Sequence, residues 1–318
     1  MKIAVIDIGT NTFKLKISRV KDNGEVLTLA KEKIPVKLGE GGFLQGRIAE
    51  APMERGVEAL KSFKQKIERF QAETILAFAT SAVRSSQNGE AFINRVRQET
   101  GIDIQVISGD EEAELIYYGV LSALDIGNED ALIMDIGGGS TEFIIANRDR
   151  IRWKHSFDLG ASRLLQEINP SDPIRKEEVN RLKNLLREKL ALLWAACEIY
   201  PVKTLIGSSG SFDSLAEMIW YRFETEENPL VKTEYHFDLS HFEKIYKVLL
   251  ASTLEKRYGM KGLAPMRVEM IVLASILIRF VFKKLHLSSM RLSTYSLKEG
   301  ILLQFLRNRN HGKDTDCG

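Results

Sequence analysis

The pattern of apolar and polar positions contains the same strand–turn–strand unit twice. Apolar stretches at 2–6 and 131–134 predict short β-strands, and each leads into a turn that holds an aspartate and glycine. A second apolar, alternating stretch comes after each turn, at 13–20 and at 142–146. Because the unit occurs about once in each half of the chain, it predicts two similar domains that face each other.

The rest of the first half alternates between helix and strand patterns. Helices are predicted at 52–70, 90–100 and 111–124, and strands at 74–79 and 102–107. This alternation predicts an α/β fold in which a mixed or mostly parallel sheet is covered by helices.

The second half becomes strongly helical after its own strand–turn–strand unit. The polar segment 125–130 is the best candidate for a boundary, which predicts one domain at 1–124 and a second at 125–297. We expect the last helix, at 298–310, to dock back on the first domain. The polar stretch 311–318 is expected to be disordered. The helices and strands predicted for the second half are, in order, 176–198, 203–206, 211–222, 240–258, 266–284, 290–293 and 296–309.

The two turns have a composition that suits phosphate binding. Glycine lets backbone N–H groups approach a ligand closely, successive N–H groups form an anion nest, and Ser and Thr add hydroxyl donors. One such turn alone would most often be structural, but two copies in matched strand contexts favour phosphate binding. The expected phosphate ligands of the two turns are Gly9, Thr10, Asn11 and Thr12, and Gly137, Gly138, Gly139, Ser140 and Thr141.

An aspartate opens each turn, Asp7 in the first and Asp135 in the second. A carboxylate beside a phosphate nest would repel the phosphate unless a cation lay between them. Each aspartate therefore indicates a divalent metal ion that retains several waters. The expected ion is Mg²⁺, and Mn²⁺ is the alternative.

Three further segments carry possible chemistry. The acidic residues of 108–113 start a helix, where they either cap it or supply a general base for water. The segment 207–211 is either an ordinary turn or a third phosphate nest at a helix N-terminus, built from Gly207, Ser208, Ser209 and Gly210. Arg84 comes after a strand, where its guanidinium could grip a phosphate or simply lie on the surface. Phosphate nests, metal carboxylates and a spare glutamate are what hydrolysis of a phosphoanhydride needs.

Composition limits the class of protein and the compartment in which this chemistry is expected. The chain of 318 residues is 44% hydrophobic and 28% charged, as in soluble globular proteins, and a net charge of +2 gives no sign of DNA binding. Cys197 and Cys317 lie far apart in the sequence, which fits a reducing, cytoplasmic compartment. The most apolar stretch, 270–282, is too short to span a membrane, and no signal peptide opens the chain.

Lysines cluster in one early segment, at Lys31, Lys33 and Lys37. Such a cluster is either a solvated strand edge or a track for a polyanion. The sequence leaves both interpretations open.

Seven motifs together resemble the exopolyphosphatase/guanosine pentaphosphate phosphatase (Ppx/GppA) family, a branch of the actin-like ATPase superfamily. They extend through nearly the whole chain and are highly specific in this order. The motifs occupy 7–13, 36–41, 79–84, 107–113, 135–142, 159–164 and 297–300.

The resemblance implies two ribonuclease-H-like domains with mixed sheets flanked by helices and an active site in the cleft between them. It implies Glu112 as the catalytic base, and Asp135 and Glu142 as the acids of the metal site with Asp7 nearby. This chain departs from the family pattern at Glu269 and at 273–274. It also ends before the helical domain of long members, so we expect a short two-domain form.

Three functions are compatible with these motifs. We favour a Mg²⁺-dependent exopolyphosphatase that acts on inorganic polyphosphate. The alternative substrate is guanosine pentaphosphate, hydrolysed to the tetraphosphate. A non-enzymatic sensor of guanosine tetraphosphate or polyphosphate is the third possibility. A homodimer is implied by the resemblance alone.

Overall fold

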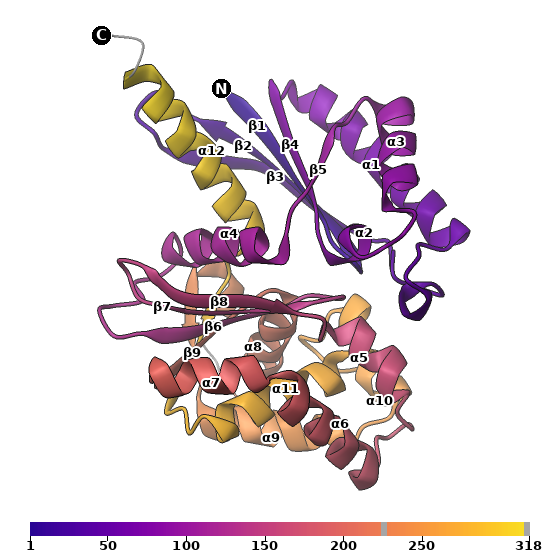
Figure 1. Cartoon of the computed structure of the whole chain (residues 1–318), viewed down its shortest axis with the longest axis vertical. Coiled ribbons are helices and arrows are strands. Elements are labelled where there is room, and N and C mark those ends of the chain that lie inside the picture. The colour runs from indigo at the N-terminus through magenta and orange to yellow at the C-terminus, as the bar shows by residue number, and fades with distance from the viewer. Residues whose placement is uncertain (224–227, 315–318) are drawn as a thin grey trace. The chain divides into compact units, whose positions relative to one another are not determined.

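The structure, a computed structural model, describes residues 1–223 and 228–314. Contacts within the chain divide it into two compact units (Figure 1). Unit 1 comprises Met1–Leu115 together with the chain from Leu297 onward, and unit 2 comprises Ile116–Ser296.

Unit 1 contains a five-stranded mixed sheet with the order β3-β2-β1-β4-β5. β2 is antiparallel to both of its neighbours, whereas β1, β4 and β5 are parallel to one another. The strands are β1 (Lys2–Ile8), β2 (Thr12–Val20), β3 (Val26–Pro35), β4 (Thr74–Ala79) and β5 (Ile104–Val106). The sequence pattern did not predict β3, because its outer half is exposed and lacks a continuous apolar stripe.

Helices cover both faces of this sheet (Figure 1). α1 (Glu50–Phe70) and α3 (Gly89–Thr100) pack with the face that carries Phe13, Leu15 and Ile17, and together they form the core of unit 1. α12 (Leu297–Asp314) contacts β1, and it lies on the other face because its Glu299 pairs with Lys16 of β2. Short α2 (Ser81–Arg84) comes after β4, and a 3₁₀ helix occupies Phe43–Gln45.

Unit 2 contains a six-stranded sheet that repeats this topology. Its order is β10-β11-β9-β6-β7-β8, so β6, β7, β8, β9 and β11 pair as β1, β2, β3, β4 and β5 do. The predicted fold class, α/β with two mixed sheets flanked by helices, is thereby confirmed, and the repeat matches paired ribonuclease-H-like domains. The strands are β6 (Ala131–Ile136), β7 (Thr141–Ala146), β8 (Ile151–Phe157), β9 (Thr204–Ser208), β10 (Glu234–His236) and β11 (Ser289–Ser293).

The helices of unit 2 pack around a core centred on α11, which is buried over most of its length. Two predicted helices are each broken in two. The stretch 176–198 divides at Leu190, and 240–258 divides where Thr253 caps a new helix by accepting a hydrogen bond from the Lys256 N–H. The helices are α5 (Ala161–Ile168), α6 (Lys176–Lys189), α7 (Ala191–Ile199), α8 (Gly210–Phe223), α9 (Leu239–Leu250), α10 (Leu254–Tyr258) and α11 (Ile271–Lys284), with 3₁₀ helices at Pro229–Val231 and Pro265–Arg267.

The described helices include none that is both long and apolar enough to cross a membrane. α11, which contains most of the chain's most apolar stretch, is instead packed inside the core of unit 2. Its apolar character is therefore explained by burial within the protein.

The division between the units differs from the predicted boundary at 124/125. It falls within α4 (Gly109–Leu121), between Leu115 and Ile116, and the chain returns to unit 1 after Ser296. The helical pattern continues through this point, so the sequence offers no local signal there. Residues 311–314, which were expected to be disordered, belong instead to α12, which continues to Asp314, and residues 315–318 lie outside the described residues.

Two glycines allow close backbone contacts next to these division points, one within unit 1 and one within unit 2. A Cβ on Gly300 would lie 1.7 Å from the Leu115 carbonyl oxygen in unit 1, and a Cβ on Gly119 would lie 2.0 Å from the Ser296 carbonyl oxygen in unit 2. Both contacts are with backbone, which cannot turn aside as a flexible side chain can. Only glycine fits at either position without moving a helix.

We expect Gly300→Ala to destabilise unit 1 by about 1–3 kcal/mol, since the added methyl group overpacks a backbone contact. Alanine inside a helix normally gains about 1 kcal/mol over glycine, so the sign of the change is diagnostic. Urea unfolding followed by circular dichroism measures it. Gly259→Ala is the control, because the nearest atom to its Cβ would lie 3.6 Å away. An unchanged or higher unfolding midpoint for Gly300→Ala would show that the contact is not tight.

Candidate functional site

The turn of unit 1 is braced from behind by the loop that comes after β3. The Asn11 carbonyl oxygen accepts hydrogen bonds from the N–H groups of Val36 and Lys37, both at 2.9 Å. Gly39 packs so closely that a Cβ there would lie 3.0 Å from Thr10 Cγ2. The loop therefore fixes the conformation of the turn that was predicted to bind phosphate at Gly9–Thr12.

The triple-glycine turn of unit 2 is held by the start of α5. The Gly137 carbonyl oxygen accepts from Ala161 N–H and the Gly138 carbonyl oxygen from Ser162 N–H, both at 2.9 Å, and the Gly139 carbonyl oxygen accepts from Gly160 N–H at 3.2 Å. In a trans peptide the N–H group points opposite to the carbonyl group. The N–H groups of residues 138–140 therefore point away from α5 together. Such an arrangement of successive N–H groups is an anion nest.

Asp135 is held by hydroxyl groups from two segments of unit 2. Its Oδ2 accepts hydrogen bonds from Ser208 Oγ at 2.5 Å, Ser209 Oγ at 2.8 Å and Ser296 Oγ at 2.5 Å. Ser209 has a φ of 69°, a left-handed conformation that is uncommon for serine and is found at functional sites. The hydroxyls of the predicted third phosphate loop thus hold Asp135. The Ser296 contribution has no local signal in the sequence.

Glu142 lies directly across the β6–β7 pair from Asp135, so both carboxylates project from the same face of the sheet. Both are buried, and Ser156 Oγ donates to Glu142 Oε1 at 2.7 Å. Arg267 is also buried nearby, against Gly210. Burial lowers the pKa of Arg267, while the charges of Asp213 and Asp135 act to raise it.

This donor set fits Mg²⁺ chemistry. Mg²⁺ is usually held by one or two carboxylates, with waters and phosphate oxygens completing its octahedron, and Asp135 with Glu142 provides such a pair. Among residues 1–223 and 228–314 no group of three or more His, Cys, Asp or Glu side chains could hold a metal. Asp7, the predicted third acid, forms an ion pair of 2.9 Å with Lys14.

The N-terminus of α4 is capped by Glu111, so Glu112 is not needed as a cap. Ser108 N–H donates to Glu111 Oε2 at 2.7 Å, and Glu111 N–H donates to Ser108 Oγ at 3.1 Å, which together form a capping box. Glu112 is buried and accepts a hydrogen bond at Oε2 from Arg84 Nη1 at 3.0 Å. Glu111 therefore takes the capping role within the acidic stretch, and the structure places the two predicted residues Arg84 and Glu112 in contact.

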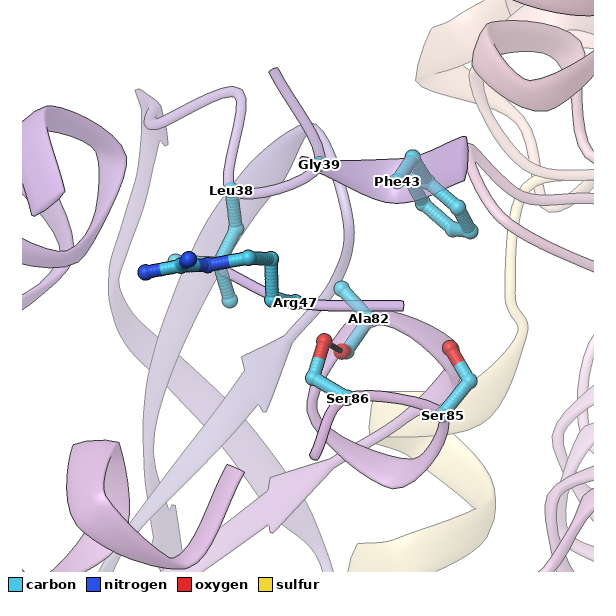
Figure 2. A pocket seen from close by; sticks show the side chains of 7 residues that line it. All are labelled: Leu38, Gly39, Phe43, Arg47, Ala82, Ser85 and Ser86. Carbon is cyan, nitrogen blue, oxygen red and sulfur yellow. Dashed lines mark hydrogen bonds between the residues drawn. The ribbon is translucent and has the colours of Figure 1, made fainter. Parts of the chain in front are cut away.

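A small pocket of unit 1 lies beside these elements (Figure 2). Its cavity volume is about 10 Å³, room for roughly one water molecule. Ser86 Oγ, which lines the pocket, donates a hydrogen bond to the Ala82 carbonyl oxygen at 2.6 Å. This hydroxyl therefore satisfies the backbone of α2. The pocket is therefore too small for a nucleotide. Its lining residues are Leu38, Gly39, Phe43, Arg47, Ala82, Ser85 and Ser86.

Comparison with known proteins gives a consistent result. The model of the Ppx/GppA phosphatase family matches residues 17–309. A solved exopolyphosphatase from Cytophaga hutchinsonii ATCC 33406 is 39% identical and has a TM-score of 0.94, covering 97% of this chain and 98% of that chain. The Aquifex aeolicus PPX-GPPA enzyme is 26% identical with a TM-score of 0.78, covering 96% of this chain and 99% of that one.

A curated relative is longer than this chain. The guanosine-5'-triphosphate,3'-diphosphate pyrophosphatase of Aeromonas salmonicida (strain A449) is 28% identical over 315 residues, which cover 98% of this chain and 60% of that protein. The chain thus spans less than two thirds of the length of that relative.

Ser208→Ala is expected to lower the free energy of unfolding by about 1–3 kcal/mol, because it removes a buried hydrogen bond to the charged Asp135. Chemical denaturation provides the measurement. Ser288→Ala is the matched control, since its hydroxyl donates to a carbonyl oxygen at an exposed position. Equal midpoints for the two variants would mean that the Ser208 hydroxyl does not stabilise the buried carboxylate.

Proposed function

The chain belongs to the Ppx/GppA phosphatase family, and from this premise we propose that it hydrolyses the terminal phosphoanhydride bond of inorganic polyphosphate. The observation that carries the proposal is Glu112, a buried carboxylate that capping does not require and that contacts the guanidinium of Arg84. The 39% identity to a solved exopolyphosphatase over nearly the whole length of both chains supports the choice of substrate.

In this proposal Glu112 accepts a proton from the water that attacks the terminal phosphorus. Its Oε2 is bonded to Arg84 in the described state, and Arg84 Nη1 also donates to the Ile107 carbonyl oxygen at 3.0 Å. A phosphate is a strong competitor for a guanidinium, since the two can form bidentate bonds. Arrival of substrate would then draw Arg84 onto the phosphate and remove its hydrogen bond from Glu112 Oε2.

In this proposal each turn binds phosphate oxygens within its own unit. The donors are the N–H groups of residues 138–140 in unit 2 and those of the turn at 9–12 in unit 1. Asp135 and Glu142 would hold Mg²⁺, which when bound supplies positive charge that stabilises the phosphate oxygens during transfer. The hydroxyls of Ser208, Ser209 and Ser296 orient Asp135 for that task.

Guanosine pentaphosphate is the alternative substrate. The similarity to a guanosine-5'-triphosphate,3'-diphosphate pyrophosphatase over 98% of this chain supports it. The chemistry at the terminal phosphate would be the same, so the two substrates differ only in the group to which that phosphate is attached. The pocket of Figure 2 offers no room for the guanine.

A cytoplasmic location forms part of the proposal. Burial raises the pKa of the Cys197 thiol to about 12, which keeps it in the unreactive thiol form at neutral pH. A homodimer stays a prediction from the family resemblance.

Glu112→Gln should reduce the rate of phosphate release by about 10²–10⁴-fold, the usual contribution of a positioned general base. The assay measures inorganic phosphate released with Mg²⁺ from long polyphosphate, short polyphosphate and guanosine pentaphosphate. Glu111→Gln is the matched control, because glutamine at this position keeps the capping box and the charge change is the same. Equal activity of both variants would remove Glu112 from the role of base.

The same assay separates the candidate functions. Release from polyphosphate that Glu112→Gln abolishes supports the exopolyphosphatase. Release from guanosine pentaphosphate alone favours the second substrate. Tight binding of either ligand without phosphate release would identify a sensor.

A further inference from the structure

A row of four polar side chains crosses the sheet of unit 2 in register. Ser156 of β8 lies directly opposite Glu142 of β7, and Glu142 lies opposite Asp135 of β6. On the other side of Asp135, the parallel strand β9 brings Ser208 into the same row. A serine therefore stands at each end of the row, with the two acids between them. Ser208 already holds Asp135, whereas Ser156 takes no part in the proposed function.

Ser156 makes the same kind of contact with Glu142 that Ser208 makes with Asp135. The Ser156 Oγ donates to Glu142 Oε1 at 2.7 Å, and the Ser208 Oγ donates to Asp135 Oδ2 at 2.5 Å. Both acids are buried, Glu142 at 1% exposure and Asp135 at 5%. A hydrogen bond to one oxygen of a carboxylate restricts its rotation and thereby orients the other oxygen. Each serine therefore fixes the direction of its neighbouring acid.

The core of unit 2 holds the edge strand β8 in the register that this contact needs. Phe157 belongs to that core, and its ring lies edge-on to Phe143 with the centroids 5.7 Å apart. Trp153, four residues earlier on the same strand, packs against the same core. Because side chains alternate along a strand, burial of these rings keeps Ser156 on the face that carries the acids.

A bound metal ion places a stricter demand on Glu142 than burial does. A buried carboxylate needs a hydrogen-bond partner, and a donor to either oxygen in any allowed rotamer would satisfy it. Mg²⁺ demands near-ideal octahedral geometry, so a carboxylate that binds it must present its oxygen in a fixed direction. A donor held in register on the neighbouring strand provides such a direction.

We propose that Ser156 is a positioning residue of the metal site, whose hydroxyl holds Glu142 so that the carboxylate is directed at the ion it shares with Asp135. The proposal rests on the proposed function for the assignment of these two acids to Mg²⁺. Ser156 touches neither the ion nor the substrate, so its effect passes entirely through Glu142. Groups that hold metal ligands in this way typically contribute about 10–100-fold to metal affinity.

The test measures the binding of Mn²⁺ alone by electron paramagnetic resonance, which reports the free ion without substrate or turnover. Ser156→Ala is expected to raise the Kd for Mn²⁺ by about 10–100-fold, because the carboxylate loses its fixed direction. Ser156→Thr keeps a hydroxyl donor and should stay within about threefold of the unaltered protein. Urea unfolding without metal checks that the variants fold.

Ser289→Ala is the matched control, since it removes a hydroxyl from the same sheet without touching an acid. The Ser289 Oγ lies 2.8 Å from the Thr204 Oγ, and Ser289 is four residues from the position on β11 that pairs with Ser208. Its Kd for Mn²⁺ should change less than about twofold, as expected for a site that shares no partners with the acids.

A second comparison shows whether Ser156 acts through Glu142. In a Glu142→Ala background, Ser156→Ala should change the Kd for Mn²⁺ by less than about twofold, because the group that the serine orients is gone. An unchanged Kd in Ser156→Ala, or the same loss in Ser156→Thr or Ser289→Ala, would overturn the proposal. A full loss that persists without Glu142, or no Mn²⁺ binding by the unaltered protein, would overturn it as well.

The outcome is separable from that of the proposed function. Mg²⁺-dependent phosphate release from polyphosphate, with Mn²⁺ binding that does not depend on Ser156, would refute the positioning role and leave the exopolyphosphatase. Ser156-dependent Mn²⁺ binding without phosphate release would refute the exopolyphosphatase and leave the positioning role.

Discussion

The register between paired antiparallel strands is the constraint on which both the candidate site and the charged side chains of the unit 1 sheet depend. It places Asp135 opposite Glu142 in unit 2, and it places Asp7 opposite Lys14 and Lys14 opposite Lys33 in unit 1. A slip of one residue would send each of these groups into a hydrophobic core and bring apolar side chains to the functional face. Burial of apolar residues in the two cores specifies the register, and the register in turn fixes the positions of these charged side chains.

Backbone hydrogen bonding provides the second level of control. The carbonyl oxygens of the triple-glycine turn are satisfied by the first residues of α5, and this orients the opposing N–H groups for an anion. At the start of α4, side chains rather than backbone groups satisfy the free N–H groups. Ser108 and Glu111 satisfy each other's N–H groups, so that Glu112 is available to Arg84. In both places one set of groups satisfies the backbone hydrogen bonds that the turn or helix start requires, and the neighbouring groups are not needed for that purpose.

Much of this arrangement could be predicted from the sequence, because turns, glycines and short apolar strands act locally. The two strand–turn–strand units and the contact partners Arg84 and Glu112 belong to such segments. Contacts between distant segments could not be predicted in the same way. Ser296 on Asp135 and Lys16 with Glu299 join positions far apart in the chain, and the division within α4 has no break in helical pattern to mark it.

The repeated topology also shows how one turn has been adapted to two electrostatic settings. Asp7 and Asp135 occupy equivalent positions, each on the first strand of its unit just before a glycine turn. Asp7 is neutralised by an ammonium group from Lys14, whereas Asp135 is held by neutral hydroxyls that leave its negative charge in place beside Glu142. Arg267 is buried nearby and interacts electrostatically with Asp135, so part of this negative charge is balanced within unit 2. The two aspartates therefore occupy equivalent turns but have different partners, an ammonium group in unit 1 and hydroxyl groups in unit 2.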